Sequence, residues 1–456
     1  MSELDPQTPN TSKPKSYDDS LFESFSEIAS LQAYEYLNGD KEYRAEQKRS
    51  FIAGEIENPT LDYPEVDLVA LESTEDRLLL LKQEVIENEQ NEVVKQAYRW
   101  RLNEKIAEVR MLKAVASGDM RRFKRYSEFI YGKPSEEVFA YTVNSVIEFA
   151  EVLLNSDDED VRQTANELLS LLPRTDESQV SEIPDQATVL LARDQTISEF
   201  GDLIDIPTDM TKLDADAIKS AFDIAIQRTG SEGWSVVIDD ETSRTGISVD
   251  QEHMQVVIPG KRSVSLDELT KLIVHEIGTH VTRRANGERS QLKLLGLGLD
   301  RYESGEEGVA TVREQSLSGE VSDFSGIDGL LAVGLSLGLD GQPRNFRQVY
   351  EILEKYYLLK NLTALKKVEE PLMKAQNTAY NRTVRTFRGT DCETPGVCFT
   401  KDIVYRNGNI GVWDVIGSNP DEMMRFNIGK YDPTNDRHLW ILEQLGITDQ
   451  DLAQLE

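Results

Sequence analysis

The sequence predicts an α+β fold that is predominantly helical, in which an N-terminal helical region is followed by a small sheet and a histidine-bearing helix. Apolar residues recur at three- and four-residue spacing from about Leu21 to Leu172, as on the buried faces of helices. Three short β-branched segments, bounded by Gly, Pro and Asp, lie within residues 233–260 and predict the sheet. Most of the chain from there to Glu456 returns to helical spacing.

The composition divides the chain into three parts. Residues 1–20 lack the basic and apolar stretches of a secretory signal and are expected to form a disordered tail. Residues 21–185 form the N-terminal helical region, where Gly118 ends a long helix or helix pair. Residues 173–186 are rich in acids, Ser and Pro and predict a linker or solvated loop. Residues 186–456 form the larger second region, which contains the sheet.

Charge and hydropathy argue against several classes of function. A net charge of −32 makes nucleic acid an unfavourable partner. The longest weakly polar run, Gly329 to Leu339, falls short of the roughly 20 residues that cross a bilayer, so no membrane anchor is expected. Cys392 and Cys398 are too few for a disulfide framework, and without an export signal they indicate reduced thiols in a cytoplasmic protein, with a local disulfide as the alternative.

One basic stretch interrupts this acidic chain between residues 95 and 125. A solvated helix face is the favoured interpretation, and a docking face for an acidic peptide is the alternative. The stretch contains Lys95, Arg99, Arg101, Lys105, Arg110, Lys113, Arg121, Arg122, Lys124 and Arg125.

The helix that follows the predicted sheet contains the sequence KLIVHEIGTHVTRRANG, residues 271–287, with two of the chain's four histidines. Ser265 is suited to cap its start, and Glu268, three positions on, completes a capping box. Asn286 and Gly287 predict its end.

His275 and His280 are five residues apart, whereas the usual helical metal motif places its histidines four apart. On a straight α-helix this offset turns the two side chains about 140° from each other. A single π turn, for which Gly278 lies in the right interval, would return them to one face, and such turns often mark functional sites. Glu276 would then serve as general base beside a metal-activated water. The alternative is that both are ordinary histidines of an amphipathic helix.

A carboxylate-rich segment, RYESGEEGVATVREQ at residues 301–315, lies a short way downstream. A catalytic zinc site needs a third protein ligand and one open position, and a carboxylate from this segment would supply that ligand. The competing interpretation is structural, because Ser304 and Glu307 match the S-x-x-E capping box at the start of a helix.

Taken together, these motifs resemble those of the zinc-peptidase family that includes the microtubule-associated tyrosine carboxypeptidase and bacterial relatives named for a QEGLA motif. The resemblance spans roughly residues 50–445 and includes the site motifs HEIGTHVTRRANG, QLKLLGLGL and YESGEEGVA. It extends to FIAGEIENPTLDYPEVD and SEFIYGKPSEE upstream, and to NFRQVYEILEKYY, RTVRTFRGT and FTKDIVYRNG downstream.

The resemblance implies a zincin-like metallopeptidase core within residues 186–456 and Zn²⁺ as the cofactor. Carried onto this chain, the zinc ligands are His275, His280 and Glu307, and the catalytic base is Glu276. Two positions depart from the family motif, since Glu306 stands for its glutamine and Val309 for its leucine. An extra acid beside the metal is expected to compete for the ion or to alter the pKa of its water.

The activity that the resemblance implies is zinc-dependent hydrolysis of the C-terminal peptide bond of a protein or peptide, with tyrosine or another aromatic residue as the released residue. A carboxypeptidase also needs a cation that binds the free terminal carboxylate. The candidates in the C-terminal section are Arg385, Arg388, Lys401 and Arg406, of which Lys401 and Arg388 are preferred, and Tyr405 is the candidate oxyanion donor. That section, residues 387–411, is Gly-rich and predicted to be irregular.

Two other functions fit the same residues. An aminopeptidase or endopeptidase would keep the zinc site without needing a terminal carboxylate. A non-catalytic binding or regulatory protein would keep zinc as a structural element and use the basic stretch for docking. The sequence predicts no oligomeric state.

Overall fold

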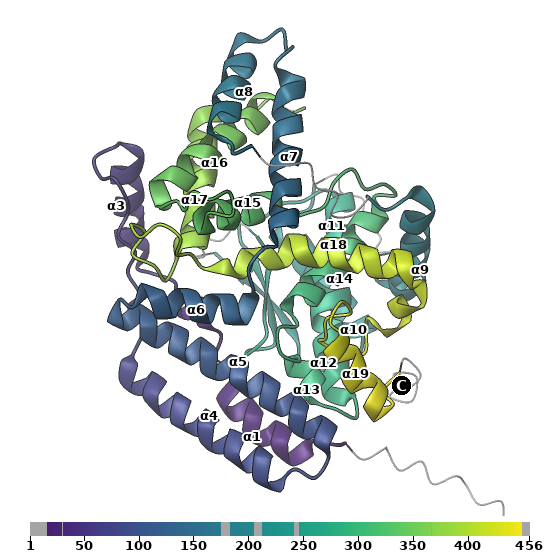
Figure 1. Cartoon of the computed structure of the whole chain (residues 1–456). Helices are drawn as coiled ribbons and strands as arrows, with labels where there is room; N and C mark the ends of the chain where they lie inside the picture. Colours follow the sequence, from purple (N-terminus) through teal and green to yellow (C-terminus); the bar gives the residue numbers. More distant parts are fainter. Residues whose placement is uncertain are drawn as a thin grey trace, which may run out of the picture.

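The computed structural model describes residues 16–29, 31–174, 183–204, 212–240, 246–365 and 367–448. Helices dominate this part of the chain and enclose a single three-stranded sheet, which confirms the predicted α+β class (Figure 1). None of the described helices is both long and apolar enough to cross a membrane.

The elements have the following bounds. The α-helices are α1 (Asp19–Ala29), α2 (Ala33–Tyr36), α3 (Lys41–Ile52), α4 (Leu68–Asn88), α5 (Glu92–Ser117), α6 (Met120–Tyr131), α7 (Glu136–Leu153), α8 (Glu159–Leu171), α9 (Gln186–Ile204), α10 (Ala215–Arg228), α11 (Leu266–Leu272), α12 (Thr282–Arg289), α13 (Leu294–Leu297), α14 (Glu303–Leu317), α15 (Ile327–Leu337), α16 (Phe346–Leu362), α17 (Pro371–Phe387), α18 (Ile403–Ser418) and α19 (Asp436–Leu445). The strands are β1 (Ser235–Asp239), β2 (Ser248–Asp250) and β3 (Gln255–Pro259); η1 (Ile273–Val281) is a π-helix, and η2 (Thr400–Asp402) and η3 (Pro420–Arg425) are 3₁₀ helices.

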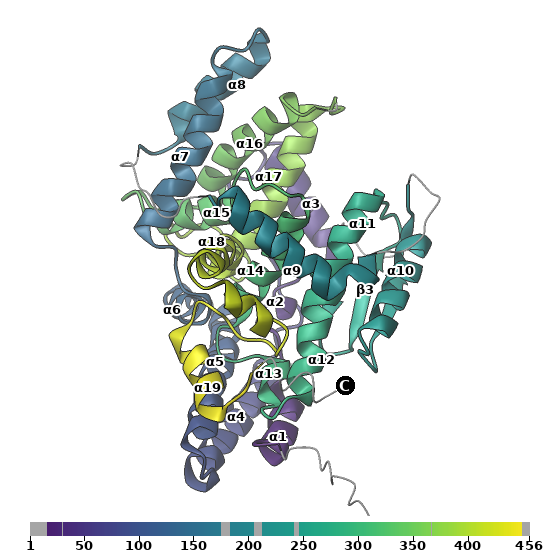
Figure 2. The ribbon, with the colours of Figure 1, turned by 90° about the vertical axis from the view of Figure 1, so that its right-hand side faces the viewer.

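The small sheet lies where the sequence predicts it, directly before the histidine helix. Its strand order is β1-β3-β2, with β3 parallel to β1 and antiparallel to β2. Val256 and Ile258 of β3 point into a core that also contains Phe222 of α10 and Ile277 of η1. Figure 2 shows α10 beside β3. The sheet therefore supports the segment that carries the histidines.

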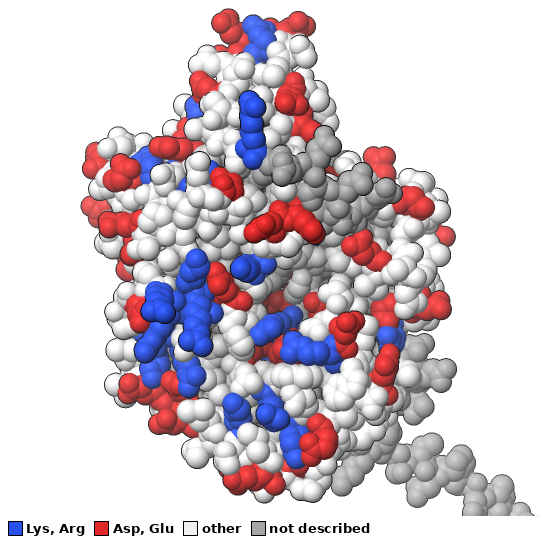
Figure 3. Space-filling model, viewed as in Figure 1, with Lys and Arg blue, Asp and Glu red and all other residues white. Residues whose placement is uncertain are grey.

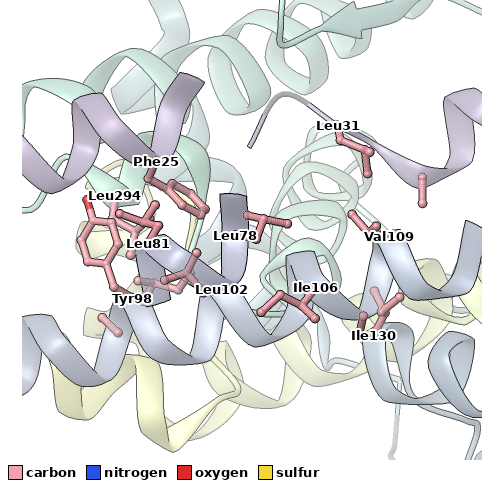
Figure 4. Close-up of a cluster of buried hydrophobic side chains, with 14 of the residues drawn as sticks. Phe25, Leu31, Leu78, Leu81, Tyr98, Leu102, Ile106, Val109, Ile130 and Leu294 are labelled. Atoms are coloured by element: carbon pink, nitrogen blue, oxygen red, sulfur yellow. The ribbon is translucent and has the colours of Figure 1, made fainter. Parts of the chain in front are cut away.

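The N-terminal helices share their cores with the rest of the chain. One cluster joins Phe25, Leu78 and Tyr98 to Leu294 and to residues of α19 (Figure 4). A second cluster joins α3 and α7 to α15, α16 and α17. The described helices between residues 21 and 171 thus pack against the same cores as the residues that follow.

The predicted tail and linker are only partly within the described residues. Residues 1–15 and 175–182 lie outside them. Residues 16–20 do not behave as a tail, because Asp18 is buried and accepts hydrogen bonds from the hydroxyl of Tyr98 and from the backbone N–H groups of Lys293 and Leu294. A buried carboxylate with three donors fixes the start of α1 against α5 and α13.

The long N-terminal pattern is a helix pair, α4 and α5, and Gly118 ends α5 in the left-handed conformation, as predicted. The basic stretch is a solvated face only in part. Figure 3 shows Lys and Arg gathered over α6, where Arg121, Arg122 and Arg125 are exposed. Arg101 and Lys105 of α5 are instead buried, each paired with a glutamate three residues on.

The predicted end of the histidine helix and the predicted capping box at its start both differ from the structure. Helix α12 continues through Asn286 and Gly287 to Arg289, and a Cβ on Gly287 would lie 2.3 Å from the backbone of Leu295 and Gly296. Glycine at 287 therefore permits a close backbone approach within the helix instead of stopping it. Ser265 caps α11 through the N–H of Glu268, but the carboxylate of Glu268 pairs with Arg262, so the box is half formed.

The predicted irregular section, residues 387–411, is helical from Ile403 onward. Gly408 lies inside α18 at its crossing with α14, where a Cβ on Gly408 would lie 2.0 Å from the carbonyl oxygen of Ser304. The opposing Gly308 of α14 has the same restriction, with the carbonyl oxygen of Gly408 2.4 Å from a Cβ there. The glycines mark a close helix crossing, which a Gly-rich pattern alone does not distinguish from a loop.

We predict that Gly308→Ala lowers the stability of the protein by roughly 1–3 kcal/mol, because the added methyl group overpacks the α14–α18 crossing. Thermal unfolding of the purified variant measures this effect. Gly417→Ala in α18 is the matched control, since nothing lies within 4 Å of a Cβ there. That control should be neutral or slightly stabilising. Equal melting temperatures for the two variants would contradict the proposed role of the crossing.

Candidate metal centre

The π turn predicted from the histidine spacing is present. Residues Ile273–Val281 form the π-helix η1, and the hydroxyl of Thr279 donates to the carbonyl of Val274, five residues back, at 2.9 Å. The rings of His275 and His280 consequently face the same side, with centroids 5.1 Å apart. The widened turn thus brings both histidine side chains to one side, whereas a straight α-helix would direct them apart.

Glu307 of α14 completes a group of three possible metal ligands. One ligand atom from each of His275, His280 and Glu307 lies within 4.8 Å of the others. The Nδ1 atoms of the histidines already contact carboxylates, Glu314 at 3.1 Å and Glu306 at 3.0 Å, which leaves Nε2 of each ring for an ion. Two imidazoles and one carboxylate are a donor set that suits a catalytic zinc.

Glu306 and Glu307 are neighbours with different environments. Glu306 is buried, and although burial raises the pKa of a carboxyl, Lys430 and Arg283 together lower the pKa of Glu306 well below its ordinary value. It therefore stays ionised and bound to cations instead of competing for the ion. The alternative in which Ser304 and Glu307 form a capping box is wrong, because the N-cap of α14 is Tyr302, which makes no side-chain cap hydrogen bond.

Glu276 lies beside the triad in an enclosed setting. Its side chain is buried and lines the same cavity as both histidines and Glu307. Burial raises the pKa of the Glu276 carboxyl, while the two histidines oppose that rise. A carboxylate made more basic by burial is suited to accept a proton from water.

The cavity at the triad has a volume of about 690 Å³ and brings together segments from the whole chain. Its walls come from α2, β2, η1, α14, α17, η2 and α18. The lining residues include Gln32, Tyr34, Asn38, Ser248, Asp250, Gln251, His275, Glu276, His280, Tyr302, Glu303, Glu306, Glu307, Arg385, Arg388, Lys401, Tyr405 and Lys430.

Tyr405 lies in α18 against the ligand Glu307. The charge of Glu307 is the largest cause that raises the pKa of the Tyr405 hydroxyl, and burial adds to it. The phenol therefore stays protonated and can donate a hydrogen bond into the cavity.

The cationic candidates separate into two kinds. Arg388 lines the cavity, stacks on Phe399 at 5.1 Å and has an Nε without a hydrogen-bond partner among the described residues. Lys401 also lines the cavity, but its Nζ pairs with Glu303 at 2.5 Å. Arg385 pairs with Asp402 at 2.7 Å at the cavity wall.

Arg406 does not belong to the cavity. Its guanidinium is fully buried elsewhere, where it donates to the carbonyl of Phe324 and pairs with Asp323. One residue after Tyr405 on α18, its side chain takes a different direction, since neighbours on a helix do not share a face.

The sequence did not reveal several residues that hold this site. Glu314 supports His275, and seven positions after Glu307 it lies on the same face of α14, so helical spacing was a usable signal. No short-range pattern marks the other supporting residues, because their partners come from other elements. Arg283 and Lys430 pair with Glu306 of α14. Asp402 pairs with Arg382 and Arg385 of α17.

A comparison with known protein families matches the region that carries the triad. The family model for the microtubule-associated tyrosine carboxypeptidase matches residues 176–323 and 366–450, together just over half of the chain. The chain belongs to this family. The matched ranges contain all three members of the triad, Glu276 and Tyr405, whereas the similar segments upstream of residue 176 and at 345–357 lie outside them. No curated protein matches the chain.

The buried Asp402 forms ion pairs with Arg382 and Arg385. Burial alone would raise the pKa of Asp402, but Arg385, Arg382 and Arg388 together hold it well below its ordinary value. We predict that Asp402→Asn destabilises the protein by about 3 kcal/mol at pH 7, because it breaks two buried ion pairs, and of the two cations only Arg382 keeps another carboxylate partner among the described residues, Asp328.

Because the folded-state pKa is depressed, this stabilisation is present above the unfolded-state pKa of about 3.9 and is lost as pH falls through the folded value. The gap between wild type and Asp402→Asn in thermal unfolding should hold from pH 8 to pH 5 and shrink only below about pH 4. A gap that closes between pH 7 and pH 5 would show that Asp402 is not held ionised.

Proposed function

We propose that the protein is a zinc-dependent carboxypeptidase, built on a zincin-like core, that removes the C-terminal residue of a protein or peptide. The observation that carries this proposal is the convergence of His275, His280 and Glu307 on one side of a cavity that also holds Glu276. Family membership supports the peptide-bond chemistry and the choice of the C-terminal bond.

His275, His280 and Glu307 would hold the ion. Zinc supplies a Lewis acid in such sites and makes water a nucleophile at neutral pH. Glu276 accepts the proton of the attacking water and returns it to the leaving amine, a role for which its burial beside the triad suits it. Tyr405 donates a hydrogen bond from its phenol to the oxygen on which negative charge develops.

Arg388 is the residue best suited to bind the terminal carboxylate of the substrate. Its stacking on Phe399 holds the guanidinium in place, and no described carboxylate forms an ion pair with it. Lys401 is a weaker candidate, because Glu303 already balances its charge. A planar guanidinium also matches a carboxylate in geometry better than an ammonium does.

We expect the purified protein to contain near-stoichiometric zinc and to release single C-terminal residues from a peptide library, as followed by mass spectrometry. Glu276→Gln should keep the zinc and lose roughly 10²–10⁴-fold in kcat. Glu268→Gln, an acid of α11 paired with Arg262 outside the cavity, is the control and should be fully active.

Each other result would favour a different function. Zinc without Glu276-dependent cleavage favours a non-catalytic binding protein, and N-terminal or internal cleavage favours an aminopeptidase or endopeptidase on the same core. A metal-free protein that stays metal-free when zinc is added would overturn the site assignment. The released residue itself tests whether the enzyme prefers tyrosine or another aromatic.

Arg388→Met should raise KM for peptides with a free C-terminus by about 10–100-fold, since a charge-assisted hydrogen bond contributes roughly 1.5–3 kcal/mol. Methionine keeps the apolar contact with Phe399 while removing the charge. The same variant should not change the weak turnover of C-terminally amidated peptides.

Lys401→Met provides the matched comparison at the other cavity-lining cation. Its effect on KM should be several-fold smaller than that of Arg388→Met, because Lys401 is engaged with Glu303. The reverse ranking would assign carboxylate binding to Lys401.

A further inference from the structure

Each histidine of the triad meets a carboxylate from the same helix, α14, on the ring nitrogen that faces away from the triad. His275 Nδ1 contacts Glu314 at 3.1 Å and His280 Nδ1 contacts Glu306 at 3.0 Å. Because a carboxylate can only accept, each Nδ1 carries the proton and each Nε2 is left as a lone-pair donor.

The two carboxylates differ in how firmly they are held. The side chain of Glu314 is 44% exposed, so water can replace its contact with His275. The side chain of Glu306 is only 5% exposed. Removal of the buried carboxylate leaves a buried imidazole N–H without a partner, which costs more than the loss of an exposed contact.

Glu306 is itself fixed by two buried cations. Its second oxygen, Oε2, accepts from Arg283 Nη1 at 2.6 Å, and Lys430 Nζ lies 3.3 Å from Oε1. Arg283 is fully buried, and its remaining nitrogens donate to the carbonyls of Gly429 at 2.8 Å and Tyr431 at 2.7 Å. The carbonyls of segment 429–431 thus hold Arg283 in place. Arg283 in turn fixes Glu306, and Glu306 contacts His280.

We propose that Glu306 is a positioning residue that fixes the tautomer and orientation of His280 as a metal ligand, and that Arg283 and Lys430 hold Glu306 in place for this purpose. A carboxylate on the outer nitrogen of a ligating histidine raises its basicity and locks its ring, and loss of such a partner typically weakens metal binding 10–100-fold. The inference rests on the proposed zinc site but not on the identity of the substrate.

The experiment measures zinc affinity of the full-length protein by competition with a chromogenic chelator. Glu306→Ala, which removes the acceptor, is expected to weaken zinc binding about 10–100-fold, and Glu306→Gln, whose amide oxygen can still accept from His280 Nδ1, is expected to weaken it less. The matched control is Asp340→Asn, because the side chain of Asp340 is only 4% exposed and pairs with Arg344 at 2.7 Å without contacting a histidine. Asp340→Asn should leave zinc affinity within twofold of wild type.

A second readout uses the metal-free protein and tests the tautomer directly. The chain has only four histidines, so their ring resonances can be assigned by substitution. In wild type His280 should be protonated on Nδ1, and in Glu306→Ala it should become a mixture of tautomers. A purely structural role for Glu306 would lower the melting temperature without this change.

Glu306→Ala leaves both Arg283 and Lys430 buried without this counter-charge, so the double variant Glu306→Ala with Lys430→Met guards against poor folding. This variant should recover part of the melting temperature but keep the weakened zinc affinity. Zinc affinity of Glu306→Ala within twofold of wild type would overturn the inference while leaving the proposed function intact. Wild type that binds no zinc would instead overturn the proposed function, and the two failures are therefore distinguishable.

Discussion

The packing of α14 between η1 and α18 is the constraint on which the candidate site depends. Helix α14 contributes Glu307 to the triad, and on its other positions it places Glu306 and Glu314 against the outer nitrogens of the two histidines. Its opposite side meets α18 so closely that both helices carry glycine at the crossing, and this closeness brings Tyr405 to Glu307. A shift of α14 would therefore displace the proposed ligand Glu307 and both histidine partners, and would change the approach of Tyr405 to Glu307.

Buried charge is balanced locally around this helix, although the chain as a whole is strongly acidic. Glu306 has Arg283 and Lys430, Glu303 has Lys401, and Asp402 has Arg382 and Arg385. Glu276 is different, because the groups that lower its pKa are the two histidines that would hold the ion. Arg388 is its cationic counterpart, stacked in place without an ion pair among the described residues. A buried site of this kind keeps its unbalanced groups where substrate and metal would complete them.

The features that could be predicted from the sequence are those that depend on the spacing of residues close together in the chain. The separation of His275 and His280 predicts the π turn because side-chain direction on a helix is fixed by residue number, and the β-branched segments predict the sheet. Glycine misled the prediction at residues 287 and 408, since the same residue that permits a turn also permits a close backbone contact, and only the partner distinguishes them. Lys430 could not be found at all, because it lies more than a hundred residues from Glu306 and carries no motif of its own.

Substrate selection is the part of the function least determined by the family match. The triad, Glu276 and Tyr405 lie within the matched ranges, but one wall of the cavity comes from α2 and its flanking residues, among them Gln32, Tyr34 and Asn38, which precede residue 176. The N-terminal helices reach the cavity because their core is shared with α13 and α19, so α2 is held against the site by the same packing that stabilises the protein. The triad and the N-terminal residues that line the cavity thus lie on different segments of the chain. Under the proposed function, a change in the N-terminal segment would alter which C-terminus enters the cavity without touching the triad or Glu276.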